Sequence, residues 1–138
     1  INVNVLKSVA ISNDAVLKNV TITEDKAYYG LWITAEGQTV DIDGLVINAP
    51  NGRGIAIKDE YIDDILSVTL NVKNAEFISK DKAAILITST AGATIMLDNI
   101  DITNVLADNV NHIWVDEDRA AALSLVTVNS PFTVILEP

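Results

Sequence analysis

The sequence has no cysteine and few aromatic residues. Without cysteine the chain can form neither disulfides nor thiolate metal sites. Aromatic residues make up 5% of the chain although 49% of it is hydrophobic, so Val, Ile, Leu and Ala must build the core. The β-branched members of this set favour strands. The composition therefore indicates a strand-rich fold.

Positive charge and long apolar runs are also scarce. Arg53 and Arg119 are the only arginines, and the formal net charge is −10. A chain of this charge cannot neutralise a row of phosphates, so we expect no nucleic-acid partner. No apolar run approaches the roughly 18 residues of a membrane helix, so we expect no membrane insertion. Cations remain plausible small partners of such an acidic protein.

The length of 138 residues predicts one domain. The sequence starts INVNV, with no Met, signal peptide or lipidation motif. We therefore expect residues 1–138 to be a single domain that is a segment or module of a longer chain.

A repeat is visible around single Asn or Gly residues. In TIMLDNIDIT, residues 94–103, two runs of alternating apolar and polar residues meet at Asn99. The same arrangement surrounds five positions at spacings of 25, 30, 25 and 30: Asn19, Gly44, Asn74, Asn99 and Asn129. A fixed period of this kind is the sequence signature of a stacked repeat fold.

The apolar pattern changes parity at each of these positions. Four and two residues before the Asn or Gly lie Ala15 and Leu17, Val40 and Ile42, Leu70 and Val72, Ile95 and Leu97, Leu125 and Thr127. One and three residues after it lie Val20 and Ile22, Leu45 and Ile47, Ala75 and Phe77, Ile100 and Ile102, Ser130 and Phe132. Side chains alternate faces in a strand. Both apolar sets can face one interior only if the residue between them is a corner joining two strands of different sheets.

A third strand recurs once in every turn. Its members are residues 9–11, 31–33, 55–57, 85–87 and 113–115. Three strands in the same order describe an all-β solenoid of about five coils, each of three short strands. An antiparallel sandwich would explain the strand density but not the fixed period. No helix of useful length is predicted, and residues 59–66 are expected to form a loop rather than one helical turn.

These residues resemble the right-handed single-stranded parallel β-helix proteins of the pectate-lyase-like superfamily. In that fold a ladder of stacked asparagines commonly follows the bend between the second and third strands. Asn19, Asn74, Asn99 and Asn129 match the ladder, with Gly44 as its substitute, because Asn and Gly tolerate left-handed backbone. The resemblance covers residues 9 to 134 and implies a bacterial extracellular or cell-surface protein.

In the family's strand naming, residues 9–11, 31–33, 55–57, 85–87 and 113–115 correspond to the first-strand sheet. The resemblance directs attention to the outer face of this sheet, where carbohydrate-active members of the family work. Alternation predicts one outward row, formed by Ala10, Trp32, Ala56, Leu86 and Trp114. Lys58, His112 and Asp116 flank this row. Trp32, Leu86 and Trp114 are therefore candidate contacts, either for sugar rings or for a loop, a subunit or further chain that covers an apolar stripe.

No catalytic residue is predicted. The outward flanking positions are Gly30, Thr34, Gly54, Lys58, Ala84, Thr88, His112 and Asp116, which supply a single carboxylate. Glycoside hydrolysis needs two. His112 is the only histidine, and a lone His without a partner is rarely a catalyst. The paired-aspartate, Gly-His-Gly and Arg-Ile-Lys motifs of family hydrolases are absent.

Two acidic clusters follow third strands. Asp59, Glu60, Asp63 and Asp64 follow residues 55–57, and Asp116, Glu117 and Asp118 follow residues 113–115. Ca²⁺ takes six to eight oxygen ligands, so calcium is a possible cofactor, although solvated, solubilising loops are the favoured interpretation. Otherwise no cofactor is expected.

The ends of such a solenoid expose strand edges and an apolar cross-section. We therefore expect the partners to be further coils of the parent chain or copies of the chain itself, and possibly polysaccharide. The leading hypothesis is a non-enzymatic scaffold, spacer or adhesin-like module. The alternatives are a segment of a polysaccharide lyase or glycoside hydrolase, and a glycan-binding module that uses Trp32 and Trp114.

Overall fold

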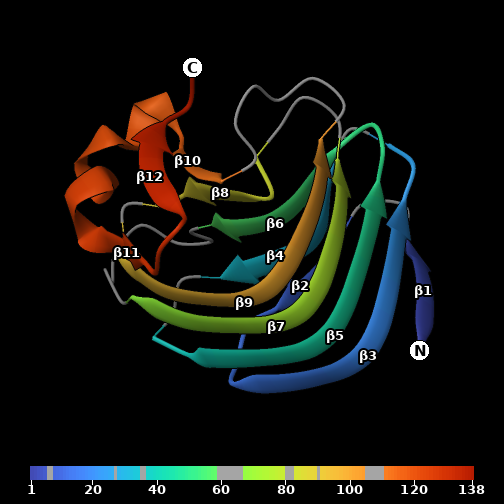
Figure 1. Ribbon diagram of the computed structural model, residues 1–138. Helices are drawn as coiled ribbons and strands as arrows, with labels where there is room; N and C mark the ends of the chain where they lie inside the picture. Colours follow the sequence, from blue (N-terminus) through green and yellow to red (C-terminus); the bar gives the residue numbers. More distant parts are fainter. Residues whose placement is uncertain are drawn as a thin grey trace.

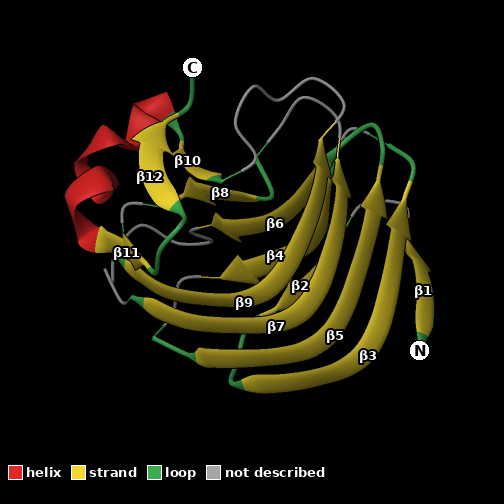
Figure 2. Cartoon of the chain, in the orientation of Figure 1, coloured by secondary structure: helices red, strands yellow, loops and turns green. Residues whose placement is uncertain are grey.

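The structure is a computed structural model that describes residues 1–5, 8–26, 28–34, 37–58, 67–79, 83–89, 91–104 and 111–138. Figure 1 shows long curved strands on one side of the molecule and short strands on the other. Figure 2 shows that strands dominate the chain and that its only described helical element lies close to the C-terminal strand.

The described strands form two six-stranded sheets, and all strand pairings within each sheet are parallel. The long sheet has the order β1 (Asn2–Val5), β3 (Ala15–Glu24), β5 (Thr39–Ala49), β7 (Val68–Ser79), β9 (Ala93–Asn104) and β11 (Val126–Val128). The short sheet contains β2 (Val9–Ile11), β4 (Tyr29–Thr34), β6 (Arg53–Lys58), β8 (Ile85–Thr88), β10 (His112–Val115) and β12 (Thr133–Leu136). The chain alternates between the sheets, so each strand pairs with the next but one in sequence. The fold is all-parallel, strand-rich and consistent with a parallel solenoid.

Each coil has two strands and not the three that the sequence predicts. The two strands expected on either side of Asn19, Gly44, Asn74 and Asn99 are halves of one continuous strand, hydrogen-bonded into one sheet. The corner exists within that strand, because φ is 52° at Asn19, Asn74 and Asn99 and 79° at Gly44. A single left-handed residue changes the facing of the side chains. The pairing skips that residue and resumes in the same register on its other side.

The predicted inward rows build the core. Ile22, Ile47 and Phe77 occupy one row of the long sheet and are fully buried. Across the interior, the aliphatic pairs of β4, β6 and β8 are equally buried: Leu31 and Ile33, Ile55 and Ile57, Ile85 and Ile87. The spacings of 25, 30 and 25 residues between the first four bends are the register of the sheet, since Val40 pairs with Ala15 and with Leu70, and Leu70 pairs with Ile95.

The register predicted for the fifth repeat, around Asn129, is wrong. Val128, and not Leu125, pairs with Ile95, so the register is displaced by three residues (128 minus 125). Leu125 is 51% exposed and Thr127 is also exposed, whereas Val126 is buried and Val128 packs against the core. Asn129 therefore does not lie opposite Asn99, and its φ is not positive.

The reason for this shift is a helix that the sequence did not reveal. Residues Glu117–Leu125 form the 3₁₀ element η1, which is two short helical segments separated by a kink at Arg119 (φ −119°, ψ 25°). It begins where the side chain of Asp116 accepts a hydrogen bond from the Asp118 N–H at 2.9 Å. Ala122 is its only buried residue and joins the core cluster. After β11 the chain crosses directly into β12, a sixth strand of the short sheet that was also not predicted.

Candidate functional site: the outer face of the short sheet

The five residues predicted to form an outward row do lie in one row. The registers of the short sheet align Ala10 with Trp32, Trp32 with Ala56, Ala56 with Leu86 and Leu86 with Trp114. Ile135 of β12 continues the row beside Trp114. The predicted row did not include Ile135 because β12 was not predicted.

The middle of this row is buried within the chain itself. Ala56 is 0% exposed and Leu86 is 1% exposed, although both lie on the side of the sheet away from the aliphatic core. Trp32 and Trp114 are partly buried, and Ala10 is exposed. The outer face is therefore a second packed surface whose two tryptophans lie at the margins of a covered centre.

Trp32 is engaged by a cation from the next coil. The Nζ of Lys58 lies 5.2 Å from the centre of the Trp32 ring, within the range of a cation–π contact. The Trp32 Nε1 is shielded from solvent and has no hydrogen-bond acceptor among the residues that the structure describes. Lys58 therefore covers part of one face of the Trp32 ring, and the indole N–H of Trp32 is buried without a described hydrogen-bond acceptor.

An ion pair that the sequence did not suggest spans this sheet. The Nη2 of Arg53, at the start of β6, donates to Oε1 of Glu137, directly after β12, at 2.5 Å. β8 and β10 lie between these two strands in the short sheet. The side chains are 17% and 21% exposed. Neither residue belongs to a repeat, which is why no spacing signal could find the pair.

Several flanking positions were assigned to the wrong face. A Cβ on Gly30 would lie 2.5 Å from Cγ2 of Ile47, and a Cβ on Gly54 would lie 2.7 Å from Cδ1 of Phe77, so both glycines face the core. Thr34 is buried, and its hydroxyl donates to the Ile11 carbonyl oxygen at 3.3 Å. Strict alternation therefore fails at Gly30 and Gly54, the second residues of β4 and β6.

The described acidic cluster, Asp116, Glu117 and Asp118, has no metal-binding geometry. Asp59, Glu60, Asp63 and Asp64 lie outside the described residues. Asp116 caps η1, and Glu117 and Asp118 are exposed in its first turn. Within the described ranges, no three His, Asp or Glu side chains come close enough together to hold a metal ion. Calcium binding stays a prediction, as does a role for His112, which is partly buried at the start of β10.

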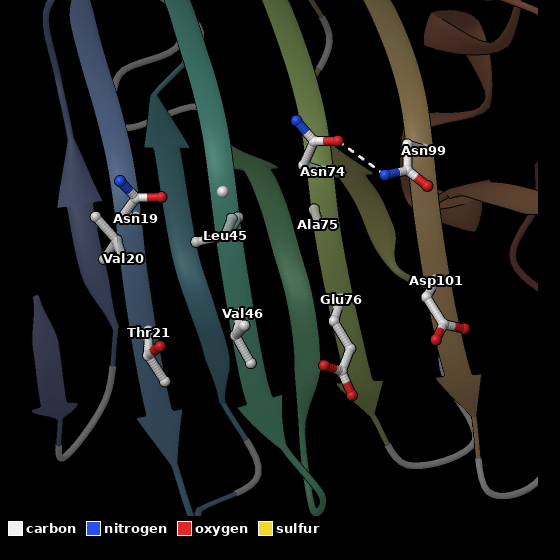
Figure 3. A pocket seen from close by; sticks show the side chains of 11 residues that line it. Asn19, Val20, Thr21, Leu45, Val46, Asn74, Ala75, Glu76, Asn99 and Asp101 are labelled. Carbon is white, nitrogen blue, oxygen red and sulfur yellow. Dashed lines mark hydrogen bonds between the residues drawn. The ribbon is translucent and has the colours of Figure 1, made fainter.

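A second candidate surface lies along the bends of the long sheet. A groove of about 460 Å³ crosses β3, β5, β7 and β9 and is lined by the ladder residues Asn19, Gly44, Asn74 and Asn99. Figure 3 shows this stretch of the sheet from close by. Asn99 Nδ2 donates to Asn74 Oδ1 at 2.8 Å, and Asn74 Nδ2 donates to Asp43 Oδ1 at 2.8 Å. The predicted ladder therefore exists at its centre, with Gly44 replaced as acceptor by its neighbour Asp43.

Comparison with known proteins gives no relative. The sequence matches no protein-family model, no curated protein and no solved structure. None of the described helical residues forms a helix long and apolar enough to span a membrane.

Proposed function

We propose that this chain is a right-handed parallel β-helix module of an extracellular or cell-surface protein, in which it serves as a rigid scaffold or spacer. The observation that supports this function is the continuous core. Aliphatic rows run without interruption through both parallel sheets from β3 to β9, and the outer face of the short sheet is packed as well. Surface location and the pectate-lyase-like relationship rest on the resemblance of the repeat to that superfamily.

A spacer of this kind is extended by stacking further coils, and one end of the module is suited to it. Val9, Ala15, Leu17 and Val20 of the first coil are only partly buried, whereas their neighbours in the next coil, Leu31, Val40, Ile42 and Leu45, are 3% exposed or less. The apolar cross-section at β2 and β3 is therefore incomplete. Coils of the parent chain or a second copy would bury it, which is favourable by roughly 25 cal/mol per Å² of apolar surface.

Self-association tests this proposal. We expect the isolated chain to associate through the β2–β3 end, and we expect Val9→Lys to abolish association because it places a charge in the stacked cross-section. Ala10→Lys is the matched control, since Ala10 is the exposed neighbour on the outer face and adds the same charge. Light scattering gives the mass of each variant. A wild-type monomer at high concentration, or equal loss in both variants, would contradict stacking at this end.

The competing function is glycan binding, either as an independent module or as part of a polysaccharide lyase or hydrolase. It is favoured by one observation, that Trp32 and Trp114 both keep exposed surface three strands apart, or about 14 Å. A change of tryptophan fluorescence on adding polysaccharide, lost in Trp114→Ser, would replace the scaffold proposal by this one.

A further inference from the structure

The long sheet has an unpaired strand edge at the opposite end from β1. β9 pairs with β7 along its whole length, but β11 covers only Ala93, Thr94 and Ile95 on its other side. Asn129 then extends this cover by one residue, because its Oδ1 accepts from the Leu97 N–H at 2.7 Å and its Nδ2 donates to the Leu97 carbonyl oxygen at 2.8 Å. Beyond that point no described strand lies beside residues 99–104 on the side away from β7 (Figure 1).

The apolar rows stop one strand short at this edge. Ile100 and Ile102 pack against the core but remain partly exposed. Their neighbours in β7, Ala75 and Phe77, are 5% and 0% exposed. A strand added beside residues 99–104, with apolar side chains at the matching positions, would complete both rows.

The charges at this edge specify the kind of strand. Glu76 and Asp101 are register neighbours, are both exposed, and project from the same face of β7 and β9 into the groove (Figure 3). Like charges directly opposite each other are unfavourable in a sheet. The row before the bend shows the opposite arrangement, since its members alternate in sign: Lys18, Asp43, Lys73 and Asp98. A cationic residue on the far side of Asp101 would give Asp101 an opposite charge as its neighbour and offset the repulsion from Glu76.

We propose that residues 99–104 of β9 are a strand-addition site for an extended segment of a partner protein. The segment runs parallel to β9 and carries Asn or Gly beside Asn99, an aliphatic residue beside Ile100, Lys or Arg beside Asp101, and an aliphatic residue beside Ile102. Backbone hydrogen bonds supply the affinity and the alternating side chains supply the specificity. This site is independent of the proposed stacking, which uses the β2–β3 end.

The probe is a fluorescent peptide, Gly-Asn-Val-Lys-Ile-Thr-Val, and its counterpart with Glu in place of Lys. Wild-type protein should bind the Lys peptide about two- to fivefold more tightly, which is the range expected for one cross-strand charge pair. Asp101→Lys should reverse this preference. Asp41→Lys, which makes the same charge change on β5, a strand paired on both sides, should leave the preference unchanged.

Amide hydrogen exchange locates the bound peptide, and residues 99–104 should be the ones newly protected. The proposal is overturned if neither peptide binds at millimolar concentration, if Asp101→Lys and Asp41→Lys behave alike, or if the protected amides lie elsewhere. It is also overturned if residues 99–104 are already protected in a dimer before peptide is added, because a second copy would then be the occupant.

Discussion

At the scale of single residues, the bend ladder depends on backbone conformation more than on side-chain chemistry. Asn19, Asn74 and Asn99 all have φ of 52°, a region that costs most L-residues roughly 1–2 kcal/mol. Asn accepts this conformation and also uses its amide, as Asn99 does with Asn74. Gly44 adopts the same positive φ but has no side-chain amide. Backbone conformation is therefore sufficient at this position of the ladder.

Substitution of Asn74 separates these two contributions. Asn74→Gly loses the hydrogen bonds to Asp43 and from Asn99, at about 1 kcal/mol in exposed positions. Asn74→Ala loses the same bonds and adds the left-handed strain, so we expect it to destabilise the fold by about 1–2 kcal/mol more than Gly. Urea unfolding measures both.

Asn71→Ala is the matched control for the Asn74 variants. It deletes an amide that donates to Asp41 at 2.7 Å in a residue without positive φ. It should therefore resemble Asn74→Gly. If Asn74→Ala is no less stable than Asn74→Gly, backbone strain does not control the ladder.

At the scale of elements, the last repeat ends where the side chain of Asn129, and no longer a backbone strand, forms hydrogen bonds with the edge of β9. β11 has only three residues, and the Asn129 amide then bonds the Leu97 N–H and carbonyl oxygen as a neighbouring backbone would. The chain is released from the long sheet at this point and enters β12. One amide therefore closes the first half of the β9 edge and leaves the second half open.

Removal of this amide should open the edge locally. We expect Asn129→Ala to accelerate hydrogen exchange of the Leu97 amide about tenfold, because two hydrogen bonds of about 0.5–1.5 kcal/mol each are lost. The neighbouring Ser130→Ala should leave that rate unchanged, since it deletes an exposed hydroxyl. Equal rates in wild type and Asn129→Ala would show that the amide does not protect Leu97.

At the scale of the whole molecule, one ion pair joins distant parts of the chain. Arg53 and Glu137 are 84 residues apart, and their contact joins the start of β6 to the segment that follows β12. Because both side chains are mostly buried, each needs the other for its hydrogen bonds.

A double-mutant cycle measures this contact. Glu137→Gln and Arg53→Gln should each destabilise the protein by about 1.5–3 kcal/mol, the usual range for hydrogen bonds to charged groups, and the double variant should cost less than their sum. Arg119→Gln is the control, because Arg119 makes no ion pair with another described residue. Additive single effects would mean that the two charges are not coupled.

Much of the fold could be predicted because it repeats. The inward rows, the first four bends and the row from Ala10 to Trp114 each recur at a fixed spacing, and a parallel stack turns spacing directly into register. The same reasoning failed wherever a residue stands outside the repeat. It placed Asn129 in the ladder by extending the interval of 30 residues. It placed Gly30 and Gly54 outside by applying strict alternation at the second residues of β4 and β6, where alternation fails.

The sequence by itself determined an all-β parallel stack with an aliphatic core, because the repeat period and the alternation of apolar residues can be recognised along the chain without knowledge of contacts between distant residues. Only the tertiary structure decided that each bend lies within one continuous strand, that η1 and β12 follow the last repeat, and that Arg53 meets Glu137. These outcomes depend on packing between residues far apart in the chain. The open edge at residues 99–104 belongs to the same class, since it exists only because β11 stops beside Ile95 and the chain leaves the sheet.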